Sequence, residues 1–382
     1  MKRLKNCRRV FKYEYFKLKE CQDSLVEWKL LSCLCTVDST VRTIAWSFIA
    51  YDDEIVFEDE LKAGGSKVYH VTPRSKSVLQ SRKELDTIFK QTQYDVFWTN
   101  KTTISNIEAL KSAKKNQVPL RIVHSHSSEN RGTKFTLFMH KKNRRQVANY
   151  ANQLLACSKE AGVWMFGEKA KEAQIIINGV DIRKYTYTKE REEKMRKELG
   201  LGDEPVVGHV GRLSKEKNHS FLFRIFQEIQ KKEPSAVLLL CGGGDEAQKK
   251  QLEEEAEVLG IRDSVRFLGV RRDVPDVLQV MNVFVFPSLF EGYPISLIEA
   301  QAAGLPTFGS KEAVPKEMGL TKEMHFLSLE EGEKQWAEAV LKELHSEKCS
   351  ETEVLLQSEV SLEKMLDTIQ KILEKRGMKH GN

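Results

Sequence analysis

Short apolar runs and amphipathic segments alternate along the chain from about residue 66 onward. The runs are too short for buried helices and are rich in β-branched and aromatic residues, so they predict strands. These strands are expected at Lys67–Val71, Tyr94–Thr99, Leu120–His124, Gln153–Cys157 and Ala173–Ile177. Because strands that are separated by helices form parallel sheets, this part of the chain predicts a doubly wound domain.

A second series of strands and helices begins after 185–204, a charged segment without a sustained apolar face that indicates a linker. Its strands are expected at Pro205–Val210, Val237–Leu240, Val265–Leu268 and Val283–Phe286. The apolar residues after the first of these strands recur at helical spacing, and Gly304 follows a helix that Pro294 opens. The predicted fold class is therefore α/β, with two doubly wound, Rossmann-like domains that face a cleft.

The first 50 residues depart from this pattern. Residues 1–62 contain no glycine, four of the seven cysteines precede residue 36, and neither an apolar opening strand nor a glycine-bearing turn is recognised there. A frame change in the coding sequence before codon 50 is a hypothesis that accounts for this composition. The expected domains are an atypical segment 1–50, a first domain 51–184, a second domain 205–345 and a helical tail 346–382.

Composition places the chain among soluble globular proteins. The 382 residues are 40% hydrophobic and 30% charged, and no stretch approaches the ~18 uncharged apolar residues of a membrane span. The basic start lacks a signal-peptide core, so a cytoplasmic location is expected. The seven cysteines include no C-x-x-C pair. Neither a zinc ribbon nor a redox site is therefore predicted, and the thiols are expected to be unpaired.

Charge is distributed unevenly between the two halves. Residues 1–180 contain 31 Lys and Arg against 19 Asp and Glu, whereas the remainder contains 30 against 36. This asymmetry indicates that the first half meets an anionic partner such as a membrane surface, a lipid phosphate or nucleic acid. The alternative is a solvated basic face. Nucleic acid is not expected as a partner, because no recognition module for it is found.

The loop after the strand at residue 205 has the chemistry of a phosphate site. The glycines Gly208 and Gly211 allow a ligand to approach the backbone closely. Arg212 and Lys217 add two cations just before a helix begins, a combination that suits a diphosphate. The alternative for this segment alone is a solvated basic loop.

Two further clusters follow other strands of the second domain. Glu291 lies in a loop and Glu299 in the next helix, so their carboxylates can reach different hydroxyls of one ligand, while amides near Tyr293–Ser296 can face a phosphate. The alternative is a helix with a surface Glu, but the apolar neighbours of Glu299 indicate a buried segment, where an unpaired carboxylate is costly. The third cluster, Arg266–Gly269, ends a strand whose backbone could contact a base.

Taken together, these clusters resemble the C-terminal domain of the retaining glycosyltransferases of the GT-B fold, in their large family-four group (group 1). The runs that carry the resemblance are VGHVGRLSKEKNH, CGGGDE, VRFLGVRRDVPDVL and FVFPSLFEGYPISLIEAQAAGLP. In the first domain, RIVHSHSSENRG and LLACSKEAGVWMFG are similar to bacterial capsule and exopolysaccharide transferases. The resemblance covers about residues 90–330.

The resemblance implies roles for individual residues. Arg212 and Lys217 would hold the donor diphosphate, and Glu299 would bind ribose hydroxyls. Glu291 would contact the donor sugar as a catalytic residue. His126, at the end of a first-domain strand, would be a second catalytic residue that contacts the transferred sugar. The alternative is that His126 is a packing residue without a role in transfer. The other expected donor-binding residues are Gly211, Leu268, Gly292, Tyr293, Pro294 and Ile295.

The expected function is sugar transfer, with retention, from a nucleoside-diphosphate sugar to a lipid-linked glycan acceptor in cell-surface polysaccharide synthesis. No D-x-D triplet and no metal-ligand spacing occurs in the sequence, so no metal and no cofactor besides the donor substrate is expected. The alternatives are a degenerate transferase that binds donor but turns over poorly, and a sugar-nucleotide epimerase of the same fold. A dehydrogenase is not expected, because G-x-G-x-x-G is absent.

Cations and apolar residues are interleaved between Arg131 and Arg145. This mixture suits shallow docking on an anionic bilayer, which would present the lipid-linked acceptor at the inner face of the plasma membrane. The alternative is a solvated helix that packs its aromatic residues on the first domain. The cations expected to contact the membrane or the acceptor are Lys141, Lys142, Arg144 and Arg145.

Overall fold

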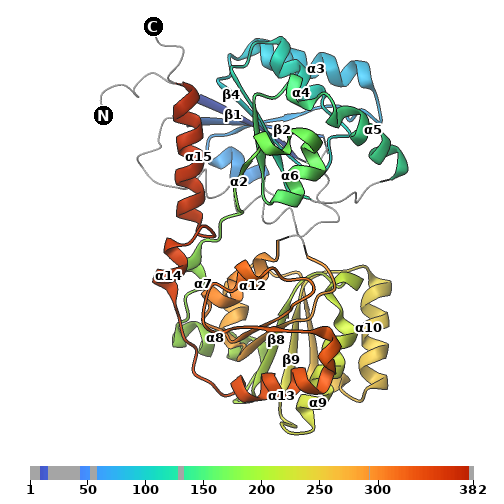
Figure 1. The fold of residues 1–382 in the computed structure, drawn as a ribbon, viewed down its shortest axis with the longest axis vertical. Helices are drawn as coiled ribbons and strands as arrows, with labels where there is room; N and C mark the ends of the chain where they lie inside the picture. The colour runs from blue at the N-terminus through green and yellow to red at the C-terminus, as the bar shows by residue number, and fades with distance from the viewer. Residues whose placement is uncertain (1–8, 16–43, 52–57, 128–132, 292, 378–382) are drawn as a thin grey trace. The chain divides into compact units, whose positions relative to one another are not determined.

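The computed structural model describes every residue except 1–8, 16–43, 52–57, 128–132, 292 and 378–382. The chain forms two units, one of residues 1–178 with 366–382 and the other of residues 179–365. This division differs from the expected linker at 185–204 and from the expected tail at 346–382. It falls earlier in the chain, and helix α15 (Leu362–Gly377) returns the chain to the first unit (Figure 1).

The first unit contains parallel β-strands joined by helices. Its two groups of paired strands are β1 (Arg9–Tyr15), β2 (Ile44–Ala50) and β3 (Lys67–His70), and β4 (Val96–Lys101), β5 (Leu120–Ser125), β6 (Gln153–Ala156) and β7 (Gln174–Ile175). Its helices before residue 178 are α2 (Glu58–Ala63), α3 (Val78–Gln91), α4 (Glu108–Lys115), α5 (Lys134–Arg144) and α6 (Lys159–Phe166). All strand pairs recorded for the described residues are parallel. The predicted α/β class is confirmed.

Two strands occur where no opening strand was recognised in the sequence. β1 and β2 pair in parallel, with Arg9 opposite Ile44 and Tyr15 opposite Ala50. Aromatic and charged residues alternate from Phe11 to Tyr15 in β1, a strand periodicity that was not recognised above, and β1 pairs with the more apolar β2. A glycine-bearing turn after β1 would fall within 16–43, which lies outside the described residues. The frame change stays a hypothesis about the coding sequence.

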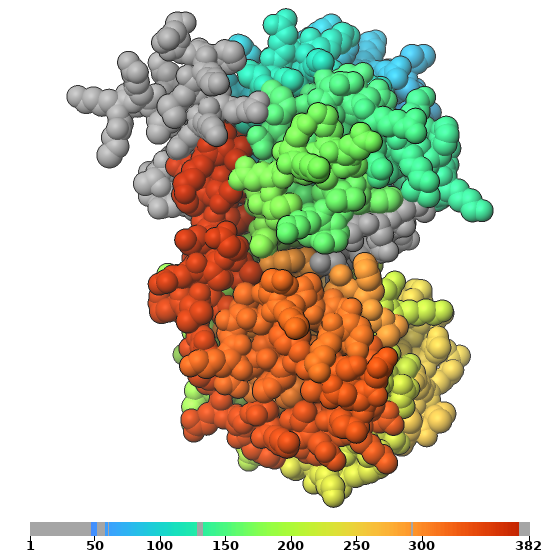
Figure 2. All heavy atoms as spheres, viewed as in Figure 1, coloured from blue at the N-terminus to red at the C-terminus, as the bar shows by residue number. Residues whose placement is uncertain are grey.

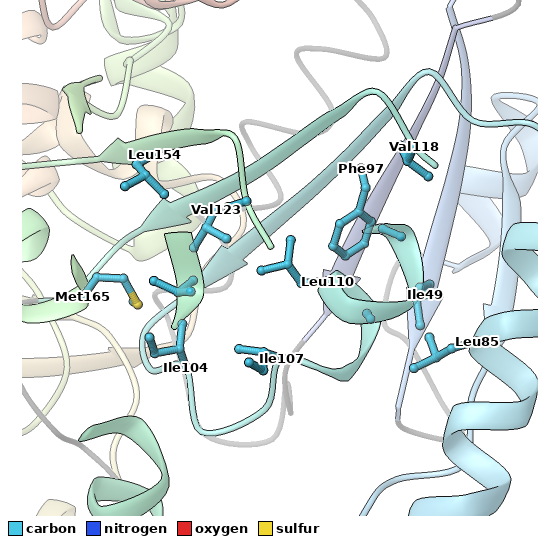
Figure 3. Close-up of a cluster of buried hydrophobic side chains, with 14 of the residues drawn as sticks. Ile49, Leu85, Phe97, Ile104, Ile107, Leu110, Val118, Val123, Leu154 and Met165 are labelled. Carbon is cyan, nitrogen blue, oxygen red and sulfur yellow. The ribbon is translucent and has the colours of Figure 1, made fainter. Parts of the chain in front are cut away.

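The core of the first unit joins the strands to α3, α4 and α6. Figure 3 shows side chains from these elements gathered in one cluster, among them Ile49, Leu85 and Leu110. Phe89 packs edge-on against Phe97, with ring centroids 5.5 Å apart. This core includes Phe97 of β4 and Val123 of β5, and so positions both strands.

The second unit has a six-stranded parallel sheet in the order β10-β9-β8-β11-β12-β13. The strands are β8 (Val206–Val210), β9 (Val237–Cys241), β10 (Val265–Gly269), β11 (Val283–Phe286), β12 (Thr307–Ser310) and β13 (Met324–Leu327). The sheet grows outward in both directions from β8 and β11, which is the order of doubly wound Rossmann sheets. Ligands bind at such a reversal point, outside the carboxyl ends of the strands.

Helices of the second unit precede, connect and follow these strands in the chain (Figure 1). They are α7 (Ile182–Tyr185), α8 (Lys189–Leu199), α9 (His219–Gln230), α10 (Glu246–Val258), α11 (Val274–Val277), α12 (Ile295–Ala302), α13 (Gly332–Glu343) and α14 (Thr352–Gln357). Phe221 of α9 and Trp336 of α13 meet edge-on, with ring centroids 5.8 Å apart, and both are buried.

The segment that the sequence indicates as a linker is an ordered part of the second unit. Most of it forms α8, in which Met195 is buried. Arg191 Nε lies 2.7 Å from Asp276 Oδ1, and Arg271 Nη2 lies 2.7 Å from Glu198 Oε1. The sequence shows no apolar face here because α8 buries only Met195. Ion pairs with residues distant in sequence attach the rest of the helix to the second unit.

Candidate functional site

The loops that follow β8 and β11 meet at the reversal point of the second sheet. The backbone N–H of Leu289 donates to the carbonyl of Glu216, at 2.8 Å. Asn218 Nδ2 donates to the carbonyl of Pro287, at 3.0 Å, while the Asn218 backbone adopts a left-handed conformation with φ 57°. These bonds hold the two loops together, so side chains that are 74 residues apart in sequence become neighbours.

Gly211 makes room for the lysine of this loop. A Cβ atom at this position would lie 2.9 Å from Nε2 of His209 and 3.1 Å from Cε of Lys217. The backbone N–H of Gly211 also donates to the carbonyl of Cys241, at 2.9 Å, which ties the loop to the neighbouring strand β9. Any larger residue would therefore displace the Lys217 side chain. Gly211 shapes the site through the space that it leaves.

Lys217 and Glu291 form an ion pair at the centre of these loops. Lys217 Nζ lies 2.8 Å from Glu291 Oε1, and the two side chains are only 15% and 10% exposed. Lys217 Nζ also lies 4.4 Å from the centre of the Phe286 ring, a cation–π distance. The structure thus brings together the residue expected to bind phosphate and the residue expected to contact the sugar. Each orients the other.

Two neutral histidines lie beneath this pair. Burial, followed by the nearby Lys217 cation, lowers the pKa of His219 to about 4. Burial, followed by His219, lowers the pKa of His209 well below its ordinary value. His209 Nδ1 lies 2.9 Å from the carbonyl of Val285, which can only accept, so Nδ1 carries the proton. At neutral pH neither ring adds positive charge beside Lys217.

Arg212 follows Gly211 in the same turn and is partly exposed. Its carbonyl accepts a hydrogen bond from the backbone N–H of Ser214, at 2.8 Å, which shapes the turn before Lys217. Both predicted phosphate-binding cations therefore belong to one loop at the reversal point.

Glu299 lies on α12 and is only 5% exposed. The hydroxyl of Tyr185 donates a hydrogen bond to Glu299 Oε1. The expectation that this carboxylate is buried is thereby met, and the partner that burial requires is present. The sequence analysis did not identify Tyr185. The only signal was an apolar pair at helical spacing, Ile182 and Tyr185, at the start of the charged segment 185–204.

The start of α12 contains the other residues expected to contact the donor. Tyr293 and Pro294 precede the helix, which begins at Ile295, and the carbonyl of Pro294 accepts from the backbone N–H of Leu297, at 3.1 Å. Gly292 lies outside the described residues. Leu268 is in β10, which is separated from β8 by β9, so it lies about 9–10 Å from β8 by strand spacing.

His126 belongs to the first unit, at the end of β5. Its backbone N–H donates to the carbonyl of Lys101, at 3.0 Å, and its ring centroid lies 4.0 Å from that of His124. Burial, followed by His126, lowers the pKa of His124 well below its ordinary value. His126 is partly exposed, whereas His124 is fully buried. Of the two, His126 is better placed to meet a substrate.

Helix α5 carries the cations expected at a membrane. Lys141, Lys142 and Arg145 are exposed, whereas Arg144 is partly buried and its Nη1 donates to the carbonyl of Trp164, at 3.3 Å. Arg131 lies outside the described residues. The segment that holds α5, teal-green in Figure 2, lies on the surface of the first unit.

The aromatic residues of α5 face solvent. Phe135 is 72% exposed and Phe138 is 63% exposed, while the buried side chains of this helix are His140 and Asn143. The alternative in which α5 packs its aromatic residues on the first domain is therefore wrong for both phenylalanines. The exposed face combines apolar and cationic side chains.

Two features are absent from the part of the chain that the structure describes. No group of three or more His, Cys, Asp or Glu side chains among them could hold a metal ion. None of the helices in the described part of the chain is long and apolar enough to cross a membrane.

Comparison with known proteins finds a family that the second unit resembles. Residues 190–355 match the family model of glycosyl transferases group 1. The Bacillus subtilis protein EpsF, which is assigned to the glycosyltransferases, is 28% identical over 312 residues, covering 78% of this chain and 79% of EpsF. An Escherichia coli UDP-Gal:alpha-D-GlcNAc-diphosphoundecaprenol alpha-1,3-galactosyltransferase is 26% identical over 244 residues, covering 61% of this chain and 62% of that enzyme.

The fold is also that of a solved structure. HepE of Anabaena, crystallised with UDP and glucose, matches with a TM-score of 0.77 at 17% identity, and the match covers 96% of this chain and 100% of HepE. This likeness extends through both units, whereas the family model matches only within the second. Residues 190–355 are therefore similar to the glycosyl transferases group 1, and the chain as a whole has the GT-B fold.

Proposed function

We propose that this group 1 glycosyltransferase transfers a sugar from a nucleoside-diphosphate sugar, and that the second unit binds the donor. The observation that carries the proposal is the ion pair of Lys217 and Glu291 at the reversal point of the sheet. In such sheets this is where nucleotides bind. The complex of HepE with UDP supports uracil as the base of the donor nucleotide to test first.

The chemistry follows from where charge develops during transfer. When the bond between the sugar and the β-phosphate breaks, negative charge grows on the departing diphosphate. Lys217 and Arg212 stabilise this negative charge in the proposed scheme. The N–H groups at the start of α12 contribute further stabilisation. Glu291 orients Lys217 and contacts the donor sugar, while His126 of the first unit contacts the transferred sugar. No metal is required in this scheme.

We further propose that the product retains the anomeric configuration of the donor. The support is the resemblance of the second-domain motifs to those of retaining transferases. Proton NMR of the first-formed linkage tests this proposal. A product with inverted configuration would contradict it.

The proposed acceptor is a lipid-linked glycan, used in cell-surface polysaccharide synthesis at the inner face of the plasma membrane. The name of the Escherichia coli relative, which acts on a diphosphoundecaprenol-linked sugar, supports this acceptor class. The exposed Phe135 and Phe138 beside exposed Lys141, Lys142 and Arg145 support docking on an anionic bilayer.

Calorimetric titration with UDP, followed by a donor-panel transfer assay on a membrane fraction, tests the function. We expect UDP to bind and one UDP-sugar to be transferred. Absence of binding for all nucleoside diphosphates would reject the assignment of the donor site. Binding without transfer from any donor would identify a degenerate transferase.

A further inference from the structure

Tyr185 connects the segment at the start of the second unit to the proposed nucleotide site. Its side chain is 2% exposed, and its hydroxyl donates to Oε1 of Glu299, which is 5% exposed. The two residues are 114 positions apart in sequence. Tyr185 is the last residue of α7, and α7 packs against α12, the helix that carries Glu299.

A buried glutamine holds the backbone of Tyr185 in place. Gln279 is fully buried, and its Nε2 donates to the carbonyl of Tyr185, at 3.0 Å, and to that of Pro275, at 2.9 Å. Its Oε1 accepts from the backbone N–H of Thr188, at 3.0 Å. Both ends of the tyrosine are therefore fixed, the backbone by Gln279 and the hydroxyl by Glu299.

We propose that Tyr185 is a positioning residue for recognition of the ribose of the nucleotide. A glutamate side chain has three rotatable bonds, and a hydrogen bond from a rigid, buried phenol restricts the plane in which its carboxylate lies. The carboxylate is then already oriented to accept hydrogen bonds from ribose hydroxyls, so binding costs less ordering of the side chain. This inference rests on the proposed role of Glu299.

The test removes the hydroxyl from the tyrosine and, separately, the hydroxyls from the ribose. Tyr185→Phe and Glu299→Gln are titrated with UDP and with 2′,3′-dideoxy-UDP. We expect Tyr185→Phe to weaken UDP binding about tenfold, which corresponds to one hydrogen bond to a charged group. We expect it to leave binding of the dideoxy nucleotide unchanged within about twofold, because that ligand offers Glu299 no hydroxyl to bind.

Tyr187→Phe is the matched control. Tyr187 lies two residues away, and its hydroxyl donates to Glu192 Oε2, at 2.7 Å, rather than to Glu299. This variant also loses one tyrosine hydroxyl that donates to a glutamate in the same unit, and it should leave UDP affinity unchanged. A thermal unfolding scan confirms that each variant is folded before titration.

The outcomes separate this inference from the proposed function. If Glu299→Gln leaves UDP affinity unchanged, Glu299 does not bind ribose and the proposed nucleotide site is wrong. If Glu299→Gln weakens UDP binding but Tyr185→Phe does not, the role of Tyr185 is overturned and the site stands. Equal weakening of UDP and dideoxy-UDP by Tyr185→Phe also overturns it. In a Glu299→Gln background, Tyr185→Phe should have no further effect on UDP binding.

Discussion

Replacing Lys217 with alanine tests the donor site most directly, because the ion pair predicts two separate effects. The first effect is on UDP binding. The variant loses a charge-assisted contact to the diphosphate, worth roughly 1.5–3 kcal/mol, or about 10–150-fold in affinity. The second effect is on the free protein. Glu291 loses the partner that lies 2.8 Å away and stays only 10% exposed, which costs about 1–3 kcal/mol of stability.

Glu291→Gln and the double variant separate these effects. Glu291→Gln removes the carboxylate that holds Lys217 in the free protein but takes away no proposed nucleotide contact. UDP affinity should therefore be maintained or raised, while sugar transfer falls. Adding Glu291→Gln to Lys217→Ala removes the uncompensated carboxylate. The double variant should be more stable than Lys217→Ala alone, with a coupling energy of about 0.5–3 kcal/mol.

Calorimetric titration with UDP, urea unfolding at neutral pH and a transfer assay measure the three quantities for the four proteins of this cycle. Two results would refute the reasoning. One is an unchanged UDP affinity in Lys217→Ala. The other is an equal loss of UDP affinity in Lys217→Ala and Glu291→Gln, because the assignment of Lys217 to the diphosphate and of Glu291 to the sugar would then be wrong.

Three further predictions concern the membrane, pH and metal. Replacing Lys141, Lys142, Arg144 and Arg145 with glutamine should abolish co-sedimentation with anionic vesicles and leave UDP binding intact. The reason is that each cation near the surface contributes about 1 kcal/mol to membrane binding. Vesicle binding that survives the replacement, or that salt does not weaken, contradicts the docking proposal. The pKa of His219 falls from 6.5 to about 4 on folding, so the unfolded chain binds more protons between these values. Stability should therefore fall by about 3 kcal/mol as pH drops from about 6.5 to about 4, and His219→Asn should show a shallower loss in urea unfolding across this range. EDTA should leave the transfer rate unchanged, and a loss that Mg²⁺ restores would contradict the metal-independent scheme.

The sequence by itself determined the fold class and predicted where along the chain the proposed donor site lies. Apolar runs of strand length separated by helical periods can only be buried as parallel strands covered by helices. Gly211 and Lys217 were assigned because a strand ends at a glycine and cations follow in the loop, whereas the role of Glu291 was implied by the family resemblance. Both inferences depend on patterns that are local in the chain. The structure confirms the parallel sheet of the second unit, and the donor site stays a prediction.

Only the tertiary structure decided which side chains contact one another. The pairing of Lys217 with Glu291 and of Tyr185 with Glu299 joins residues 74 and 114 positions apart. Periodicity reports that a position is buried but not which partner it meets. The same limit explains α8, whose many charged residues leave no apolar face. This helix is held by ion pairs such as Arg191 with Asp276. Such contacts exist only after the chain has folded, so no local pattern can encode them.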